Sequence, residues 1–331
     1  MLTVNQLTLT HRKDLTVLVD SLSFTLNDGE RLALIGEEGN GKSTLLRVLA
    51  GDPSVESYIE VSGSFSCRDS AAYLPQELPE SERTLSAYDF FCMSPVFFDQ
   101  SPRELGELAA RLSLPADVFY SDQLMQTFSG GERVKLQLAR LLMSSPTTLL
   151  LDEPTNDLDS DSVLWLENFL LSCKLTVLFV SHDEALLSRV ATSILLLERL
   201  RRRQVPRATL YRMGYDRFYE ERGAAFEKQT RIARKEREDF NAKMERYDAI
   251  RRKVERDQNA ISRQDPHGSR LLKKKMHTVQ AMGRRFEREQ ENMTAMPEQE
   301  EAIFAKLDCA PLPADKTVLD LSCAELSVGG R

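Results

Sequence analysis

The sequence lacks any apolar run long enough to cross a membrane, since no stretch approaches the roughly 18 apolar residues that a transmembrane helix needs. Its start has no basic segment followed by an apolar core, so no signal peptide is predicted. Only 5 cysteines are present, without a C-x-x-C pair, which argues against a zinc or disulfide framework and fits a reducing compartment. We therefore expect a cytoplasmic protein. Its 331 residues suffice for one full domain and additional structure.

Charge is divided unevenly along the chain. Residues 1–198 contain 14 Lys and Arg against 29 Asp and Glu, a net −15, whereas residues 199–291 contain 27 against 15, a net +12. Residues 292–331 contain 3 against 7, a net −4. A strongly basic part after an acidic one favours a nucleic-acid or acidic-surface partner for the basic part. A solvated helix of mixed charge is the alternative.

The most informative pattern is a phosphate-binding loop, G-x-x-x-x-G-K-S, in the correct context. The apolar residues 32–35 before it predict a buried strand, and residues 44–49 after it predict a helix. Glycines let backbone N–H groups wrap around phosphate oxygens, and the helix N-terminus adds partial positive charge. Lys42 is expected to reach the β- and γ-phosphates, and Ser43 to ligate Mg²⁺. The nucleotide-binding candidates are Gly36, Glu37, Glu38, Gly39, Asn40, Gly41, Lys42, Ser43 and Thr44.

Four further motifs follow in a fixed order. They are Gln76 after an extended segment, Ser129-Gly130-Gly131 at the start of a helix, Asp152-Glu153 at the end of an apolar strand, and His182 after another strand. Strands that alternate with helices form a parallel sheet with its chemistry at the carboxyl ends of the strands. The predicted fold is therefore an α/β P-loop NTPase with a parallel-sheet core.

The set and order of these motifs resemble the ATP-binding cassette family over roughly residues 1–198, with the helical subdomain at about 77–135. The resemblance implies that the chain binds ATP and Mg²⁺ and hydrolyses ATP. It implies that Ser43, Gln76 and Asp152 surround the metal. Gln76 would also contact the attacking water. Glu153 would be the catalytic base, and His182 would contact the γ-phosphate.

The same resemblance implies a second cassette, because cassettes close head to tail around two ATP molecules. Ser129, Gly130 and Gly131 would then face the γ-phosphate of a nucleotide held by the other cassette. Cassettes usually stack adenine on an aromatic side chain ahead of the phosphate-binding loop. Residues 9–15 contain no Phe, Tyr or Trp, so His11 and Arg12 are the candidates to stack on the base.

Beyond the cassette, apolar residues repeat every seven positions, which predicts helices packed against each other. One row is Tyr219, Phe226, Ala233, Phe240, Tyr247, Val254 and Ile261; a second is Leu272, Val279, Phe286 and Met293. We predict an antiparallel helical hairpin whose first arm, at 1.5 Å per residue, is roughly 70 Å long. The second arm is expected from about 269 to 296, with Asp265 as its cap and Pro266 in its first turn. The expected tip is basic through Arg263, Arg270, Lys273, Lys274 and Lys275.

The last residues resemble the first. Residues 317–331 alternate apolar and polar as residues 2–9 do, so we interpret 199–310 as a linker and 311–331 as the start of a truncated second cassette. A cassette, a basic hairpin and another cassette resemble the ATP-binding cassette F subfamily, as does the stretch from Glu153 to Asp159. That resemblance implies a ribosome-bound factor whose hairpin approaches rRNA and the P-site tRNA, in translation or antibiotic resistance.

Two other functions remain open. One is the ATPase subunit of a membrane transporter, although a long basic hairpin has no obvious use there. The other is a chromosome-maintenance ATPase, in which a coiled coil separates the phosphate-binding loop from the later motifs. Here all the motifs precede the hairpin, which argues against that class.

Overall fold

The computed structural model describes residues 1–67, 70–199, 205–260 and 266–291. Its central sheet has the order β5-β6-β7-β3-β8-β9, in which β5, β6, β7, β3 and β8 are parallel and β9 is antiparallel to β8. The strands of this sheet are β3 (Arg31–Ile35), β5 (Ala71–Leu74), β6 (Thr148–Asp152), β7 (Thr176–Val180), β8 (Ser193–Arg199) and β9 (Val205–Tyr211). Every residue of β6 and β7 is buried, as expected for strands covered on both faces. The predicted parallel core is confirmed.

A second, antiparallel sheet packs against this core. It has the order β2-β1-β4 and consists of β1 (Leu2–His11), β2 (Val17–Leu26) and β4 (Ile59–Cys67). Its buried side chains join those of α1 (Lys42–Leu49), which follows β3, in one apolar cluster. The helix after the phosphate-binding loop is therefore held from two sides.

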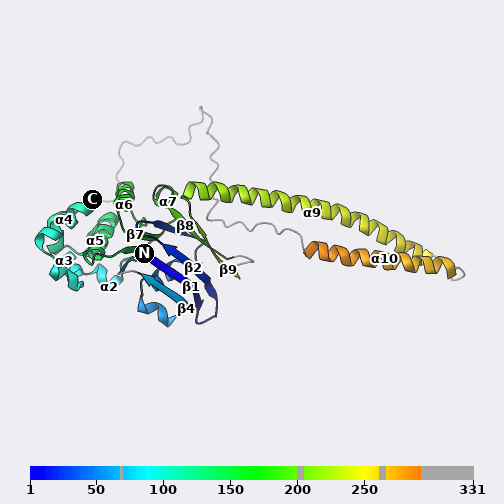
Figure 1. Cartoon of the computed structure of the whole chain (residues 1–331), viewed down its shortest axis with the longest axis horizontal. Coiled ribbons are helices and arrows are strands. Elements are labelled where there is room, and N and C mark those ends of the chain that lie inside the picture. Colours follow the sequence, from blue (N-terminus) through cyan, green and yellow to red (C-terminus); the bar gives the residue numbers. More distant parts are fainter. Residues whose placement is uncertain (68–69, 200–204, 261–265, 292–331) are drawn as a thin grey trace, which may run out of the picture. The chain divides into compact units, whose positions relative to one another are not determined.

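Helices α3, α4 and α5 gather on the side of the cassette away from the antiparallel sheet (Figure 1). The helical elements of the cassette other than α1 are η1 (Pro53–Ser57), α2 (Glu80–Arg83), α3 (Ala87–Cys92), η2 (Pro95–Asp99), α4 (Pro102–Leu112), η3 (Ala116–Tyr120), η4 (Met125–Thr127), α5 (Gly130–Met143), α6 (Ser160–Ser172) and α7 (Glu184–Val190). Helix α4 begins with a capping box in which Ser101 and Glu104 satisfy each other's backbone N–H groups. The segment expected at about 77–135 to form a helical subdomain lies between β5 and β6, and α5 continues past that expected end to Met143.

The sheet extends past residue 198. Strand β9 pairs with β8: Tyr211 lies opposite Ile194 at one end of the ladder, and Pro206 lies opposite Arg199 at the other. The boundary expected at 198 therefore falls inside a β-hairpin. The distribution of charge along the sequence could not reveal this, because the arginine-rich segment between the two strands looks like the start of a basic linker. The long helix begins only at Tyr215.

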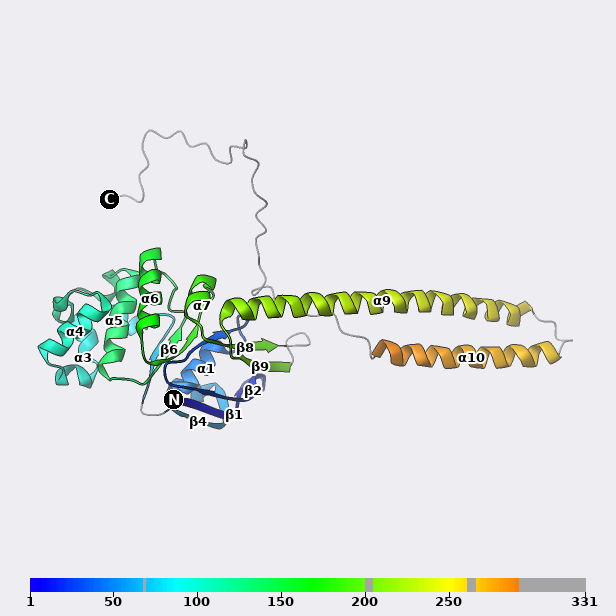
Figure 2. The same ribbon diagram turned by 45° about the horizontal axis from the view of Figure 1, so that its top comes forward.

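The linker forms the predicted antiparallel hairpin. Helix α9 (Tyr215–Ala260) and helix α10 (Pro266–Glu291) lie side by side in both views (Figures 1 and 2). Phe286 contacts Phe240 and Tyr247 with ring centroids 6.3 and 5.5 Å apart, and Lys243 pairs with Glu289. The heptad positions thus meet across the seam. Ile261, Arg263, Asp265 and Met293, and the proposed second-cassette segment, lie outside the described residues.

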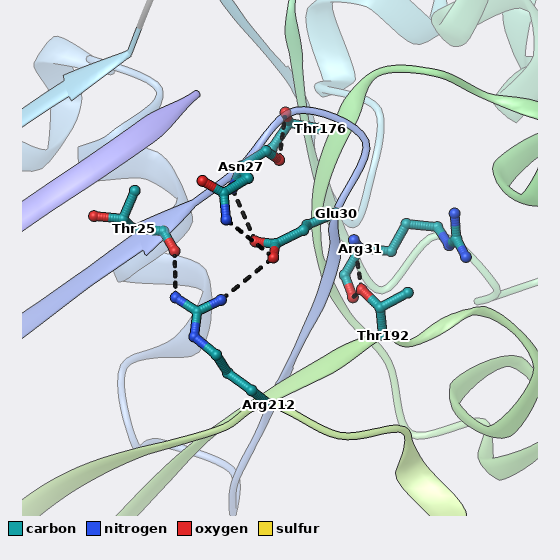
Figure 3. A network of polar contacts seen from close by, with 7 residues as sticks. All are labelled: Thr25, Asn27, Glu30, Arg31, Thr176, Thr192 and Arg212. Carbon is teal, nitrogen blue, oxygen red and sulfur yellow. Dashed lines mark hydrogen bonds and ion pairs between the residues drawn. The ribbon is translucent and has the colours of Figure 1, made fainter.

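A network of polar contacts joins the start of β3 to the segment that leads into α9 (Figure 3). Arg212 pairs with Glu30 at 3.3 Å and donates to the Thr25 carbonyl at 2.9 Å. The Glu30 carboxylate also accepts from the backbone and side chain of Asn27 at 2.8 and 3.1 Å. Partial burial acts to raise the pKa of Glu30, but the Asn27 hydrogen bonds and the Arg212 charge outweigh it and lower that pKa.

Glu30→Gln is expected to lower the free energy of unfolding at neutral pH by about 1 kcal/mol at most, because these groups are partly exposed. A lowered pKa in the folded state means that the charged form stabilises the fold above the carboxyl's ordinary pKa. The difference between variant and parent should therefore shrink as pH falls below about 4.5. Urea midpoints of the variant and the parent, measured at neutral pH and below about pH 4.5, give this difference in stability. Glu60→Gln is the control at an exposed acid. A constant difference across this range would contradict the assignment.

Among the described residues, no helix is long and apolar enough to cross a membrane.

Candidate nucleotide site

The phosphate-binding loop is held against the sheet by contacts that tolerate little change. A Cβ atom added to Gly36 would lie 2.3 Å from the Leu197 carbonyl oxygen of β8. The buried Asn40 side chain donates to that same carbonyl at 3.0 Å, and its backbone N–H donates to Glu37 at 3.3 Å. Asn40 was predicted to bind nucleotide, but its side-chain amide and its backbone N–H both form hydrogen bonds within the protein. It shapes the loop by fixing it to β8.

Lys42 points its charge into the loop. Its ammonium donates to the carbonyls of Gly36 at 2.6 Å and Glu37 at 3.2 Å, and the residue is only 8% exposed. Burying an ammonium is costly unless it is hydrogen-bonded, and these two carbonyls supply hydrogen bonds. An anion bound in the loop would lie beside this positive charge. Glu38, in contrast, is exposed.

A cavity of about 580 Å³ opens above the loop, where β3, β6 and β7 end. Its lining comes from segments far apart in the sequence: Leu18, Glu38, Gly39, Gly41, Lys42, Ser43, Thr44, Gln76, Glu153, Asn156 and His182. Parallel strands place their carboxyl ends at one edge, which is why these segments meet. Leu18 and Asn156 were not anticipated from the sequence. Asn156 could have been, because it follows the Asp152-Glu153 strand end by only a few residues.

Asp152 lies fully buried beneath the cavity and is held by two hydroxyl groups. Ser43 donates to one carboxylate oxygen at 3.0 Å, and Tyr73 donates to the other at 3.0 Å. The Tyr73 hydroxyl in turn accepts from Arg47 Nε at 3.4 Å. Burial raises the pKa of Tyr73 to about 12, so its hydroxyl remains a donor at neutral pH. Sequence reasoning missed Tyr73 and Arg47, because their contacts require β5 to lie beside β6 and α1 to lie against β5.

Glu153 and His182 are in contact in the lining of the cavity. The Glu153 carboxylate lies 3.1 Å from His182 Nε2, and the glutamate backbone adopts a left-handed conformation with φ of 47°. A non-glycine residue held in that region costs roughly 1–3 kcal/mol, and such residues cluster at functional sites. Burial raises the pKa of Glu153, while the nearby His182 and Lys42 charges oppose the rise. A carboxylate in this setting is a better proton acceptor than an exposed one.

The Ser129-Gly130-Gly131 motif, at the start of α5, does not line this cavity. Ser129 caps the helix and exchanges hydrogen bonds with Glu132 in a capping box. A Cβ atom at Gly130 would lie 2.1 Å from the Asp157 carbonyl oxygen, and one at Gly131 would lie 2.0 Å from Ser162 Oγ. Both glycines are thus required for close packing of α5 against the segment after Glu153. None of the three motif residues lines the cavity around Lys42.

His11 and Arg12, the two candidates for stacking on the base, form hydrogen bonds with other residues. His11 Nδ1 lies 2.9 Å from an Asp14 carboxylate oxygen, and Arg12 donates to the Ile59 carbonyl at 3.2 Å. Neither lines the cavity, whereas Leu18 of β2 does. The structure therefore places an aliphatic side chain, rather than His11 or Arg12, beside the phosphate-binding loop.

Comparison with known proteins agrees with this geometry. Residues 19–156, which include the phosphate-binding loop, Gln76 and Asp152-Glu153, match the family model described as ABC transporter. This chain carries an ATP-binding cassette. Cassettes of this family are ATPases.

Curated relatives of the cassette belong to the F subfamily. ATP-binding protein Uup of Buchnera aphidicola is 32% identical over 184 residues, covering 55% of this chain and 30% of that protein. Probable ATP-binding protein YheS of Escherichia coli K12 is 31% identical over 216 residues, covering 56% and 33%. Elongation factor 3 of Phytophthora infestans is 35% identical over 182 residues, covering 54% and 17%. The chain thus spans a third or less of the length of these relatives.

Solved structures support the fold of the cassette. A nucleotide-free ATP-binding cassette from an ABC transporter superposes with a TM-score of 0.52 at 16% identity, over 66% of this chain and 94% of that one. An ATP-binding subunit of an ABC transporter gives 0.52 at 20% identity, over 67% and 93%.

Proposed function

We propose that this chain is the first cassette and the linker of a two-cassette ATPase that acts on the ribosome. The observation that carries the proposal is that four of the five cassette motifs meet at one cavity, with Ser129-Gly130-Gly131 at the start of α5, and that a long basic hairpin follows the cassette. The proposed domains are a cassette from residue 1 to about 211, where β9 ends, a linker from there to about 310, and the start of a second cassette at 311–331.

The cavity suits a nucleoside triphosphate with Mg²⁺. Lys42 offers a buried ammonium in a glycine-rich loop, and the Ser43 hydroxyl and Asp152 carboxylate lie 3.0 Å apart at its base. Mg²⁺ prefers such oxygen ligands and usually shares them with substrate phosphates. Ser43 and Gln76 would hold the ion, with Asp152 orienting its surroundings. When bound, Mg²⁺ neutralises charge that develops on the phosphates.

In this proposal the residues around the cavity divide the work of hydrolysis. Lys42 and the loop N–H groups bind the β- and γ-phosphates, and Gln76 positions the attacking water. Glu153 accepts a proton from that water at its carboxylate. His182, 3.1 Å from Glu153, orients that carboxylate and contacts the γ-phosphate. The raised pKa of Glu153 matches it better to proton transfer near neutral pH.

Tyr73→Phe tests whether the second hydroxyl on Asp152 matters for the metal. The change keeps the ring but removes the donor to the buried carboxylate, so Mg²⁺ should bind about tenfold more weakly, as is typical for groups behind metal ligands. The measurement is a Mg²⁺ titration of the binding of a fluorescent ATP analogue. Binding without Mg²⁺ should be unchanged, and Tyr120→Phe is the control at an exposed tyrosine. An unaltered Mg²⁺ dependence would show that Ser43 alone holds Asp152 in place.

The proposed second cassette completes the site. Ser129 and Gly131, with Gly130, would face a nucleotide held by the other cassette, which accounts for their absence from the lining of the cavity around Lys42. This chain alone should therefore hydrolyse ATP slowly, unless two copies associate head to tail. Sedimentation with ATP and Mg²⁺ of the Glu153→Gln chain measures association without turnover. Rapid hydrolysis by a chain that stays monomeric would refute the need for a second cassette.

The hairpin supports a ribosomal partner. Arg270, Lys273, Lys274 and Lys275 are exposed on α10, and within the described part of the chain none of them forms an ion pair. With Arg263, they would contact rRNA phosphates or the P-site tRNA. The name of one relative, elongation factor 3, points the same way. We further propose that the protein acts in the cytoplasm, in translation or in resistance to an antibiotic. Sedimentation with ribosomes, with and without ATP, tests the proposal.

A transporter ATPase is the second candidate, because the matched solved structures are transporter cassettes. Association with a membrane permease, without any ribosome binding, would favour it.

A further inference from the structure

The helical subdomain exposes a patch of large apolar side chains. Its members are Phe98, 66% exposed, Met93, 57%, Tyr120, 56%, and Tyr88 and Leu124, each 39%. Single exposed apolar residues are ordinary, but a contiguous group of aromatic residues usually marks an interaction site. We refer to these five residues as the aromatic patch.

Ring contacts join three of the five members of the aromatic patch. The rings of Tyr88 and Tyr120 lie 6.4 Å apart, and Phe97 lies 6.2 Å from each of them and 5.7 Å from Phe98. Leu124 adjoins the same region, because Leu124 forms a β-bridge with Ser86, the cap of α3.

The patch is also rigidly supported from below. Phe91 is fully buried and contacts Phe119 at 4.9 Å and Phe97 at 5.8 Å between ring centroids. These buried rings join α3, η2 and η3, so the exposed rings are presented on a fixed base. Preorganised aromatic side chains lose little conformational entropy on binding, which is why they act as anchors in interfaces.

The rim of the patch is acidic. Residues 86–124 contain six Asp and Glu against two Arg, and Arg103 is engaged by Glu107 at 2.9 Å. Exposed Asp89, Asp99, Asp117 and Asp122 each lie within three residues of a patch aromatic in sequence. Such a rim repels phosphates, which makes nucleic acid and anionic lipid unsuitable partners. It attracts lysine and arginine instead.

We propose that the aromatic patch docks a basic amphipathic segment of a partner protein. Apolar side chains of the segment cover Phe98, Tyr120 and Tyr88, and its lysines or arginines face the acidic rim. This arrangement is independent of the nucleotide site, because none of the patch residues lines that cavity. Its charge is opposite to that of the hairpin, so the protein has one surface suited to RNA and another suited to basic protein.

A fluorescent helical peptide of leucine and lysine, with the lysines on one face, is the probe. It should bind the full 331-residue chain, and a matched peptide with glutamate in place of lysine should not. The double change Phe98→Ser and Tyr120→Ser should weaken binding at least about tenfold, the loss expected from two interface anchors. Leu164→Ser with Leu171→Ser removes comparably exposed leucines from α6 and should change binding little.

Three outcomes would overturn the proposal. Equal binding by the patch variant and the parent would place the peptide elsewhere on the acidic cassette. Equal binding of the two peptides would indicate non-specific apolar adhesion. Loss of single-stranded RNA binding in the patch variant would make the surface a nucleic-acid site. Unchanged binding of an ATP analogue by the patch variant checks that its fold is intact. None of these three outcomes bears on the proposed ATPase function.

Discussion

Glu153→Gln is expected to abolish nearly all ATP hydrolysis while leaving ATP bound. The change keeps the size of the side chain beside His182 but removes the proton acceptor, and loss of such a group typically costs about 10²–10⁴-fold in rate. Because Lys42, Ser43 and the loop are untouched, affinity for an ATP analogue should stay within a few-fold of the parent. The measurement is phosphate release together with nucleotide binding, in the two-cassette protein.

Glu38→Gln is the matched control for this experiment. Glu38 lines the same cavity and loses the same charge, but it is exposed and belongs to the phosphate-binding loop, not to the segment after β6. Its hydrolysis rate should therefore remain close to that of the parent. Normal turnover by Glu153→Gln would remove this residue from the catalytic role.

Neutralising the hairpin tip is expected to weaken ribosome binding steeply. With Arg263, Arg270, Lys273, Lys274 and Lys275 changed to Gln, the tip no longer neutralises RNA phosphates and fewer counterions are released on binding. The plot of log affinity against log salt should become shallower, by about one unit for each phosphate that is no longer neutralised. Co-sedimentation of the ATP-trapped Glu153→Gln protein with ribosomes across a salt series measures this change.

A matched variant separates position from net charge. Changing Lys228, Arg231, Arg234, Lys235 and Arg237 to Gln removes the same charge from the part of α9 nearer the cassette. It should bind ribosomes more tightly than the tip variant at every salt concentration. ATP binding should be intact in both. If the tip variant sediments with ribosomes as well as the parent does, the tip is only a solvated helix end, and any ribosome binding must come from the cassette surfaces.

The sequence allowed the main elements to be predicted because their signals are local. The phosphate-binding loop was predicted between a buried strand and an amphipathic helix, and the structure has β3 before it and α1 after it. The hairpin was predictable for a similar reason, since a seven-residue repeat describes a helix face whatever the rest of the chain does. The meeting of Gln76, Glu153 and His182 around one cavity also followed, because each comes after a strand of the same parallel sheet.

Only the tertiary structure decided which groups support those residues. Tyr73 reaches Asp152 because β5 pairs with β6. Asn40 donates a hydrogen bond to the Leu197 carbonyl because the loop packs against β8. Strand β9 belongs to the sheet although its flanking arginines resemble a linker. The aromatic patch likewise needs α3, η2 and η3 to converge. Hydrophobic periodicity and motif spacing act within one segment, so the sequence by itself determined the segments and their chemistry. Pairing and packing act between distant segments, and they set the hydrogen bonds, the buried charges and the exposed surfaces.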